Sequence, residues 1–446
     1  IRGLEGFGGK NEHDILTGIQ LLHSGEERKL LGYALPIAEE IKQTLEKLPY
    51  VDRVDIAGSL RRMKETIKDV DMLVASDHPQ KVMDFFTNMK NVRIVLANGT
   101  TRSAVVLKEG LNCDVRVLDK KIYGAGLQYF SGSKDHAVAL RTYAAKKGFK
   151  LSEYGLFKRK DGKEKFVCGR TEEEIYHALG MQYIPPEMRE NQGEIDIALK
   201  KKLPKIIGYD SIKGDLHMHT NWSDGVNSTE EMIKAGERME YSYIAITDHS
   251  KSTTIANGLD EKRLVKHIDE IHKTAEKHGK IHVLAGSEVD ILPNGRLDYD
   301  DKILKRLDFV VASVHSRFKS GKAEMTSRIL KALDNPYMRV LGHPSGRLIN
   351  ERNPYEFDAE KIIEKAVDKG IALEVNAFPN RLDLHDVYIR NVVERNGMIC
   401  INTDSHAAEH LQFMRYGIGQ ARRGWAEEKN VINSWTWKKF NKFIER

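Results

Sequence analysis

Hydrophobic and polar positions follow different patterns in the two halves of the chain. In the first half, residues 11–22 and 34–48 repeat apolar side chains at helical spacing, which predicts two amphipathic helices. A further helix is predicted over residues 81–89. Short apolar runs predict strands over residues 51–57, 69–74, 103–107 and 112–118. The first half is therefore expected to hold a mixed domain of helices and strands.

The second half repeats a short apolar strand followed by a helical stretch, seven times in all. One predicted strand precedes His217, and six others cover residues 243–247, 281–286, 309–314, 339–341, 371–375 and 398–402. A polar residue of a kind that binds metals or substrates stands at the C-terminal end of each strand. In a parallel β/α barrel, that end carries the active site. We therefore expect a seven-unit β/α barrel over residues 213–446.

Two further segments flank the first domain. The glycine-rich residues 3–10 lead into the first predicted helix. They resemble the hairpin of a helix-hairpin-helix, whose backbone amides bind a nucleic-acid phosphate, with a plain turn before a helix as the alternative. Residues 184–212 combine prolines, mixed charges and weak periodicity, which predicts a linker with at most one short helix.

The composition fits a soluble, highly charged protein of two or three domains. The 446 residues are 40% hydrophobic and 30% charged, and no apolar run approaches the ~20 residues of a membrane helix. Three scattered cysteines are too few for a disulfide framework and favour a reducing cytoplasm. The net charge of +6 permits a polyanionic partner without requiring one. Because the chain opens at Ile1, we expect a piece of a longer protein that lacks its N-terminal part.

Three acidic residues of the first half are predicted to converge. Asp69 and Asp71 share one face of a strand, and Asp114 lies on another strand that can neighbour it. Such convergence is costly unless cations neutralise the charges. Two Mg²⁺ ions holding a nucleoside triphosphate would do so. Ser59 and Arg62, at a turn into a short helix, are suited to the phosphates.

The histidines and acids at the barrel strand ends predict a second metal site. His217 and His219 are two apart, so both side chains point the same way on an extended backbone. Alone, such a pair is more often a surface or packing feature. The full set is His217, His219, Asp224, His249, Glu288, His315, His343, Asp404 and His406. This mixture of imidazole and carboxylate is enough for three metals and favours Zn²⁺, Mn²⁺ or Fe²⁺ over Mg²⁺.

The acidic motifs and their neighbours resemble the palm and thumb of the family X DNA polymerases. The matching stretches are Gly58-Ser59-Leu60-Arg61-Arg62, Asp69-Val70-Asp71, Cys113-Asp114-Val115-Arg116, Tyr129-Phe130-Ser131-Gly132-Ser133 and residues 146–156. The resemblance implies a helical fingers remnant over residues 1–50, a palm over 51–120 and a thumb over 121–183. It also implies that Asp69, Asp71 and Asp114 hold Mg²⁺ or Mn²⁺. The implied nucleotide-binding residues are Gly58, Ser59, Arg62, Tyr129, Phe130, Gly132, Ser133 and Arg141.

The chain departs from the polymerase beta pattern at two positions. Lys134 and Ala137 stand where that pattern has an aspartate and an asparagine, which puts nucleotide affinity and fidelity in doubt. The N-terminal lyase domain of the family also has no counterpart in these residues. Removal of a 5′-deoxyribose phosphate is therefore not carried over by the resemblance.

The ordered strand-end ligands resemble the PHP (polymerase and histidinol phosphatase) superfamily over roughly residues 213–430. The resemblance implies that His217, His219, Glu288 and Asp404 hold one metal. By the same resemblance, Glu288, His315 and His343 hold a second, and Asp224, His249 and His406 a third. A metal-activated hydroxide would then attack a phosphoester.

Other side chains receive plainer predictions. His267, His272, His278 and His282 lie in or beside a charged helix and are expected to face solvent. Trp425, Trp435 and Trp437 are expected to pack rather than stack on bases. Arg347 and Arg381, in loops after strand ends, are candidates for gripping a substrate phosphate, with a surface role as the alternative.

A family X palm fused to a PHP barrel resembles the bacterial and archaeal family X polymerases. The function expected from this is a monomeric DNA repair enzyme that binds gapped or primer–template DNA and deoxynucleoside triphosphates and fills short gaps. The barrel would act as a 3′–5′ exonuclease, with 3′-phosphatase and abasic-site endonuclease activities as further options. One alternative is a small-phosphoester phosphatase fused to a nucleotidyltransferase with a non-DNA substrate. Another is that one module is only a structural platform for DNA.

Overall fold

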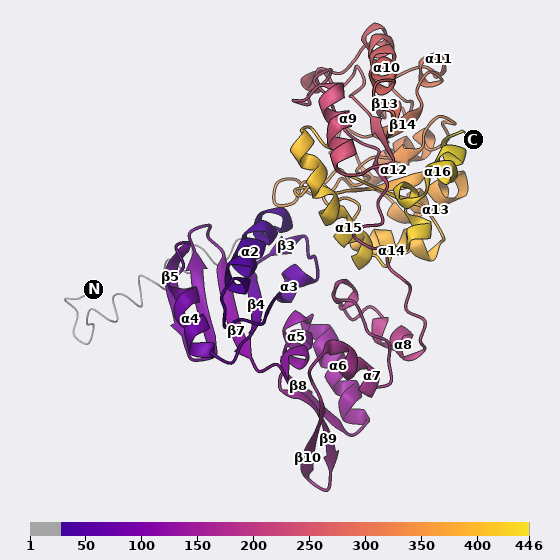
Figure 1. Ribbon diagram of the computed structural model, residues 1–446. Helices are drawn as coiled ribbons and strands as arrows, with labels where there is room; N and C mark the ends of the chain where they lie inside the picture. The colour runs from indigo at the N-terminus through magenta and orange to yellow at the C-terminus, as the bar shows by residue number, and fades with distance from the viewer. Residues whose placement is uncertain (1–27, 446) are drawn as a thin grey trace, which may run out of the picture. The chain divides into compact units, whose positions relative to one another are not determined.

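The computed structural model describes residues 28–445, and the chain divides into two compact units, Ile1–Leu203 and Pro204–Arg446 (Figure 1). The boundary falls inside the segment predicted as a linker. The glycine-rich turn over residues 3–10 and the helix predicted over residues 11–22 lie outside the described residues. None of the helices in residues 28–445 has the length and apolar character that a membrane span requires.

The first unit is built on a five-stranded sheet with the order β2-β4-β7-β6-β5. Its strands are β2 (Arg53–Ile56), β4 (Asp69–Ala75), β5 (Val92–Asn98), β6 (Arg102–Leu107) and β7 (Asn112–Leu118). Only β4 and β7 pair in parallel. Helices α2 (Leu31–Glu46) and α4 (Pro79–Thr87) pack on this sheet with their apolar faces. The mixed fold expected from the sequence is confirmed.

Strand β5 was not predicted, because its pattern is weak. It lies at the edge of the sheet and alternates half-buried with exposed residues, and its pairing with β6 is interrupted by two bulges. An edge strand of this kind lacks the continuous apolar run that marks the buried strands β4 and β6. Short strands β1 (Lys29–Leu30) and β3 (Thr66–Ile67) form a separate pair.

The remainder of the first unit is helical with one small antiparallel sheet. Its helices are α3 (Gly58–Arg61), α5 (Tyr123–Ser131), α6 (Lys134–Lys146), α7 (Glu172–Ala178), the 3₁₀ turn η1 (Pro186–Met188) and α8 (Glu194–Leu199). The small sheet contains β8 (Phe149–Ser152), β9 (Gly155–Lys160) and β10 (Lys163–Cys168). Arg189 and Glu194 are fully buried, so the first part of the predicted linker packs into this unit.

The second unit is a barrel of seven parallel strands arranged in chain order. They are β11 (Gly214–Asp215), β12 (Tyr243–Ile246), β13 (His282–Asp290), β14 (Phe309–Ser313), β15 (Val340–Leu341), β16 (Ala372–Asn376) and β17 (Ile399–Asn402). Beyond the last paired residues of β11 and β17, a parallel bridge between Met218 and Ser405 brings the first strand beside the last. The predicted (β/α)7 barrel is therefore confirmed.

Helices surround the barrel and alternate with its strands (Figure 1). They are α9 (Thr229–Arg238), α10 (Glu261–Ala275), α11 (Asp301–Leu304), α12 (Lys322–Ala332), α13 (Ala359–Lys369), α14 (Asp386–Glu394), α15 (Met414–Arg423) and α16 (Trp437–Ile444). Short 3₁₀ turns are η2 (Thr254–Ala256), η3 (Ala408–Phe413), η4 (Glu428–Asn430) and η5 (Ile432–Ser434).

The C-terminal segment packs against the interior residues of the barrel. Tyr243 of β12 stacks on Phe440 of α16 with ring centroids 4.4 Å apart, in a buried cluster that includes Phe309 and Phe443. Trp435 and Trp437 pack against the same cluster, and Trp425 is 3% exposed, so the predicted packing role of the tryptophans is confirmed. Apolar side chains thus fill this part of the barrel, while the metal-type residues gather beyond the other ends of the strands.

Candidate metal centre and nucleotide pocket

Three carboxylates meet near the N-terminal ends of the neighbouring parallel strands β4 and β7. Asp71 of β4 pairs in register with Asp114 of β7, and Asp69 lies two residues before Asp71 on the same face. Burial raises the pKa of Asp71 to about 6, and the charges of Asp69 and Asp114 add to the shift. Arg102 donates to Asp114 at 2.8 Å. The remaining crowding of like charge is what divalent cations would relieve.

Gly58 allows the chain to pass directly over this acidic edge. Its φ is +61°, and a Cβ at this position would lie 2.2 Å from Oδ2 of Asp71. Any larger residue would therefore displace the carboxylate as well as strain the backbone. The position explains why a glycine stands before Ser59.

The residues predicted to bind a nucleotide line one pocket of about 490 Å³. Its lining includes Gly58, Ser59, Arg62, Asp69, Asp71, Tyr129, Phe130, Gly132, Ser133 and Arg141. Lys134 and Ala137, the two departures from the polymerase beta pattern, also line it. The sequence reasoning missed Lys64 and Lys68, which stand on the pocket wall beside the acids. A basic wall next to a carboxylate cluster suits a metal-bound polyphosphate.

Contacts within this pocket fix several of its side chains. Arg62 donates to Glu190 at 3.0 Å and to the carbonyl oxygen of Ser131 at 2.5 Å. Arg141 lies over the ring of Tyr129 at 5.4 Å, and Tyr129 packs edge-on against Phe130 with centroids 5.1 Å apart. These contacts hold Arg62, Tyr129, Phe130 and Arg141 in place on the pocket lining.

In the barrel, the nine predicted ligands lie together beyond the C-terminal ends of the strands. Ligand atoms within 4.8 Å of one another form three overlapping groups. The groups are His219, Asp224, His249 and His406; His217, His219 and Asp404; and His249, Glu288 and His315. His343 joins them through Glu288, at 2.8 Å. The partition of these residues among three individual metals stays a prediction.

The geometry of this cluster fits bound divalent metals. Four buried histidine nitrogens have no hydrogen-bond partner among the described residues: His217 Nε2, His219 Nδ1, His315 Nδ1 and His343 Nδ1. His249 Nδ1 lies 2.9 Å from Glu288 Oε2. Unpartnered buried polar atoms are costly and rare, and metal coordination would satisfy them. The mixed imidazole and carboxylate donors suit Zn²⁺, Mn²⁺ or Fe²⁺.

Two of the ligands also sit in unusual backbone conformations. His343 has φ +23° and Asp404 has φ +52°, in the left-handed region that disfavours side chains. Each such residue costs on the order of 1–3 kcal/mol, and strain of this kind concentrates at functional sites. Placing these two side chains in the cluster therefore reduces the stability of the fold.

Several residues that the sequence reasoning missed orient the ligands. Glu374 of β16 accepts from His217 Nδ1 at 2.7 Å and from the backbone N–H of His343 at 2.7 Å. It also accepts from Asn402 at 2.8 Å. Carboxylates that hold the second nitrogen of a metal-binding histidine fix its tautomer and ring plane. The available signal was a lone acid in β16 between the apolar Leu373 and Val375.

The prediction that His267 faces solvent is wrong. It is fully buried, and its Nε2 lies 2.7 Å from Asp248. Asp248 in turn accepts from the backbone N–H groups of Thr220 and Ser223, at 2.9 and 3.2 Å. His267 lies on the inner face of amphipathic α10, and this network holds the loop that carries Asp224. Of the other three, His272 and His282 are exposed and His278 is half-buried.

The pocket above the cluster has a volume of about 370 Å³ and includes two arginines, Arg381 and Arg352. Arg381 was predicted, and its Nε lies 3.4 Å from Asp404. Arg352 was not predicted from the sequence. Arg347, the other predicted arginine, donates to the carbonyl oxygens of Arg381 and Leu382 and lines a neighbouring pocket instead.

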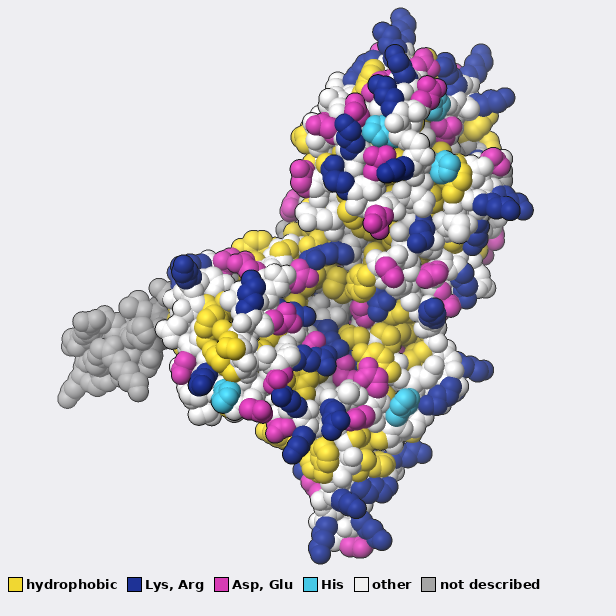
Figure 2. Space-filling model, viewed as in Figure 1, with side chains coloured by type: hydrophobic (Ala, Val, Ile, Leu, Met, Phe, Trp, Pro, Cys, Tyr) yellow, Lys and Arg dark blue, Asp and Glu magenta, His cyan; other side chains and the backbone are white. Residues whose placement is uncertain are grey.

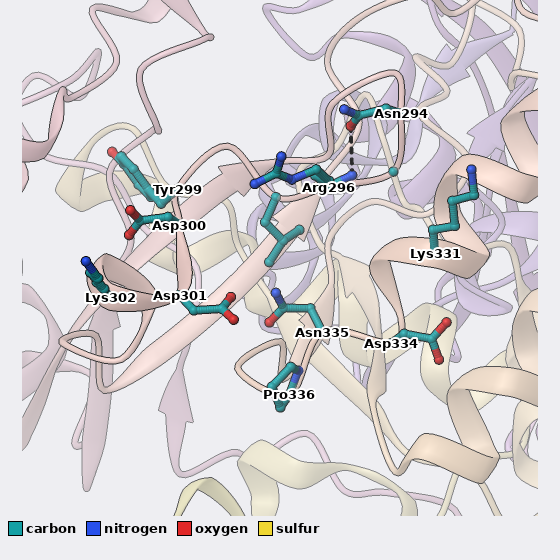
Figure 3. Close-up of a pocket in the computed structure, with 12 residues that line it drawn as sticks. Asn294, Arg296, Tyr299, Asp300, Asp301, Lys302, Lys331, Asp334, Asn335 and Pro336 are labelled. Carbon is teal, nitrogen blue, oxygen red and sulfur yellow. Dashed lines mark hydrogen bonds between the residues drawn. The ribbon is translucent and has the colours of Figure 1, made fainter.

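A further pocket of about 620 Å³ lies between the segment after β13 and the end of α12 (Figure 3). Lysines, an arginine and aspartates alternate around it, and Asn294 accepts from the backbone N–H of Arg296 at 3.0 Å. None of the nine metal-type residues lines it. Although this pocket is larger, the chemistry lies in the two pockets described above.

Comparison with known proteins shows which family the chain belongs to. Family models for the DNA polymerase beta thumb and the PHP domain match residues 126–190 and 215–378. The DNA polymerase/3′–5′ exonuclease PolX of Bacillus subtilis is 39% identical over 448 aligned positions, covering 100% of this chain and 78% of that protein. The chain belongs to the PolX family.

The barrel alone resembles a second group of proteins. A probable phosphatase of Caldanaerobacter subterraneus is 29% identical over 167 residues, which cover 36% of this chain and 61% of that protein. A probable phosphatase of Caldicellulosiruptor bescii is 32% identical over a stretch of the same length. The PolX relative matches both units, whereas these two phosphatases each match 36% of the chain, so the PolX family accounts for the palm as well as the barrel.

Proposed function

We propose that the first unit is a DNA polymerase that adds deoxynucleotides to a 3′ end in short gaps. Asp69, Asp71 and Asp114 would hold two Mg²⁺ or Mn²⁺ ions, which supply Lewis acidity to the attacking hydroxyl and the leaving pyrophosphate. The observation that carries this proposal is that Asp69 and Asp71 line a pocket with basic and aromatic side chains, while Asp114 pairs in register with Asp71 on the neighbouring strand.

The remaining residues of this pocket would bind and orient the nucleotide. Ser59 and Arg62 stand beside the acids, where the triphosphate would lie. Tyr129 and Phe130 would contact the sugar, and Arg141, held over Tyr129, would face the template side. Lys134 and Ala137 would leave the base less constrained than the residues of polymerase beta do.

We further propose that the barrel is a 3′–5′ exonuclease that cleaves phosphodiesters at the 3′ end of DNA. The nine ligands would hold three divalent ions, Zn²⁺, Mn²⁺ or Fe²⁺, which supply a hydroxide nucleophile and a Lewis acid. Arg381 and Arg352 line the same pocket and are suited to a substrate phosphate. A 3′-phosphatase or abasic-site endonuclease activity would use the same groups.

The proposed partners are gapped or primer–template DNA and deoxynucleoside triphosphates, bound by a monomer. Basic side chains gather at the tip of the β9–β10 hairpin, as Figure 2 shows at the lower end of the view. They are Lys158, Arg159, Lys160, Lys163 and Lys165. Such a strip would contribute salt-dependent affinity for a phosphate backbone. All three cysteines are free thiols, which supports a reducing cytoplasm.

A second candidate function rests on the barrel's similarity to probable phosphatases. In that case the barrel would hydrolyse a small phosphomonoester and would not act on DNA. The pocket of about 370 Å³ has room for such a molecule.

The two candidate functions are distinguished by measuring primer extension and primer shortening on the same DNA. A gapped duplex with a 5′-labelled primer is incubated with the protein, Mn²⁺ and, in half the samples, deoxynucleoside triphosphates. The proposed function predicts primers extended to the gap end with nucleotides and shortened stepwise without them. Hydrolysis of a small phosphomonoester with the primer left at full length would favour the phosphatase and overturn the exonuclease.

A further inference from the structure

We propose that Ile255 is a wedge that separates the terminal base pair of a DNA 3′ end before that end enters the metal pocket. The side chain is 98% exposed, yet it lines the pocket that holds Asp224, His249 and Glu288. This inference rests on the proposed exonuclease function and adds how a paired substrate reaches the site.

The exposure of Ile255 is unusual within its own unit. The described residues of the barrel unit include five large exposed apolar side chains: Tyr209 at 45%, Val226 at 73%, Met239 at 39%, Ile255 at 98% and Val387 at 54%. The two most exposed, Ile255 and Val226, both lie on loops that follow a metal-type ligand, His249 and Asp224. Single exposed apolar residues are common, but Ile255, the most exposed of the five, lines the pocket that holds the metal-type residues.

The loop that carries Ile255 is firmly held. On one side, Ser252 donates its backbone N–H to Asp298 at 2.7 Å and its hydroxyl to Asp290 at 2.9 Å. On the other, Asn257 donates to the carbonyl oxygen of Trp222 at 3.1 Å. Gly258 closes the turn, since a Cβ there would lie 2.0 Å from the carbonyl oxygen of Ser250.

A second clamp fixes the same loop to the one that carries Asp224. Arg263 of α10 donates to the carbonyl oxygen of Asn257 at 2.9 Å and also to that of Trp222. An apolar side chain on so constrained a tip stays in water rather than folding onto the protein. A contact that forms only with substrate would account for it.

The depth of the metal site explains why a wedge is needed. His217, His219, Glu288 and His343 are at most 2% exposed, and the pocket above them holds about 370 Å³. A pocket of that size takes a molecule of nucleotide dimensions and not a duplex. A paired 3′ nucleotide must therefore leave its partner first, and apolar side chains inserted at a base step lower the cost of unstacking.

The test compares one sequence as a single strand and as a paired 3′ end. Wild-type protein, Ile255→Ala and the control Met239→Ala are assayed with Mn²⁺ on both forms, and the ratio of single-strand to paired cleavage rates is taken. Met239 is also exposed and apolar but lies at the end of α9 that leads into β12, away from the pocket lining. We expect Ile255→Ala to raise the ratio about tenfold and Met239→Ala to leave it unchanged.

A second measurement follows base unstacking on a primer that the protein does not cleave. A primer with a 3′-terminal 2-aminopurine and a cleavage-resistant phosphorothioate linkage reports base unstacking as fluorescence. Binding of the wild-type protein should raise that signal, and Ile255→Ala should raise it less. A ratio and a fluorescence change equal to those of the wild type would overturn the wedge alone. Equal losses on both DNA forms would also overturn it, and absence of any wild-type DNA cleavage would overturn the exonuclease proposal itself.

Discussion

The two sites of this chain solve the same electrostatic problem in different ways. The palm site has three carboxylates, no histidine is among the described residues that line its pocket, and Asp69 is exposed at the start of β4. The barrel has nine predicted ligands of mixed type, six of which are less than 7% exposed. Hard Mg²⁺ is usually held by one or two carboxylates together with substrate phosphates, whereas buried mixed donors hold metals without substrate. We therefore expect the palm to bind its metals together with the nucleotide, and the barrel to bind its metals before the substrate arrives.

The protonation of the acids reflects this difference. Burial first, and then the charges of Asp69 and Asp114, raise the pKa of Asp71 to about 6, although Arg116 and Arg62 act in the opposite direction. In the barrel, burial also disfavours charge on Glu288, but His315 and His249 outweigh it and hold its pKa well below the usual range. His315 and His249 thus offset the charge of Glu288, whereas Arg116 and Arg62 only partly offset the charge around Asp71.

The largest expected effect separates the palm from the barrel. Asp71→Asn removes a carboxylate that would bind both metals, so primer extension should fall by about 10³-fold, the scale of several kcal/mol of transition-state stabilisation. Shortening of the primer without nucleotides should continue at the wild-type rate. Gel analysis of a labelled gapped primer measures both. A parallel loss of shortening would show that the sites are not independent.

The reciprocal change acts on the barrel. His343→Ala removes a buried imidazole 2.8 Å from Glu288, and Mn²⁺-dependent shortening should fall by a similar factor of about 10³ while extension persists. Metal content of the purified variant, measured by mass spectrometry, should drop as well. Normal shortening by this variant would exclude the barrel as the nuclease.

A third effect concerns the stability of the first unit. Arg189 is fully buried and donates to Glu172 at 2.6 Å, and Arg61 donates to the same carboxylate. Glu172→Gln would leave these cations uncompensated, at a cost of about 3–5 kcal/mol. Calorimetry should show an earlier unfolding transition, with Glu173→Gln, an exposed neighbour, as the control.

The pH dependence of that effect has a definite sign. Burial raises the pKa of Glu172, but Arg189 and Arg61 outweigh it and lower the pKa from 4.5 to about 2. A depressed pKa gives stability that is present above about pH 4.5 and lost as pH falls toward 2. The difference between wild type and Glu172→Gln should therefore shrink across this window. A difference independent of pH would contradict the ion-pair explanation.

The smallest expected effect tests how the barrel ligands are oriented. Glu374→Gln replaces an acceptor of several N–H groups by an amide that must turn its own N–H₂ toward one of them. Metal affinity should fall about 10–100-fold, measured by competition with a chelating dye. Glu364→Gln, on the exposed side of α13, should bind metal as the wild type does. Equal affinities in the two variants would remove Glu374 from the site.

Much of this architecture could be read from the chain. The seven strand ends placed all nine barrel ligands at one end of the barrel, because a period of about one strand and one helix repeats along the sequence. The buried strands β4 and β6 followed from their apolar runs. Edge strand β5 did not, since half-exposed residues carry little periodicity.

Side chains that support the ligands were harder to predict. His267 sits in a charged helix whose sequence does not show which face is covered, and only packing placed it on Asp248. Arg352 lies far from any strand end and reaches the pocket through a loop. Such positions depend on loop geometry, for which short-range sequence patterns provide no rule.

The sequence by itself determined the ligand types, their order and the strands that carry them, because these follow from local periodicity and from the chemistry of each residue. The tertiary structure alone decided which distant groups meet. His217 and Glu374 are 157 residues apart and lie within 2.7 Å, and Gly58 leaves room for Asp71 from another strand. Such contacts arise only when the chain folds, since only then do burial and desolvation act on both partners.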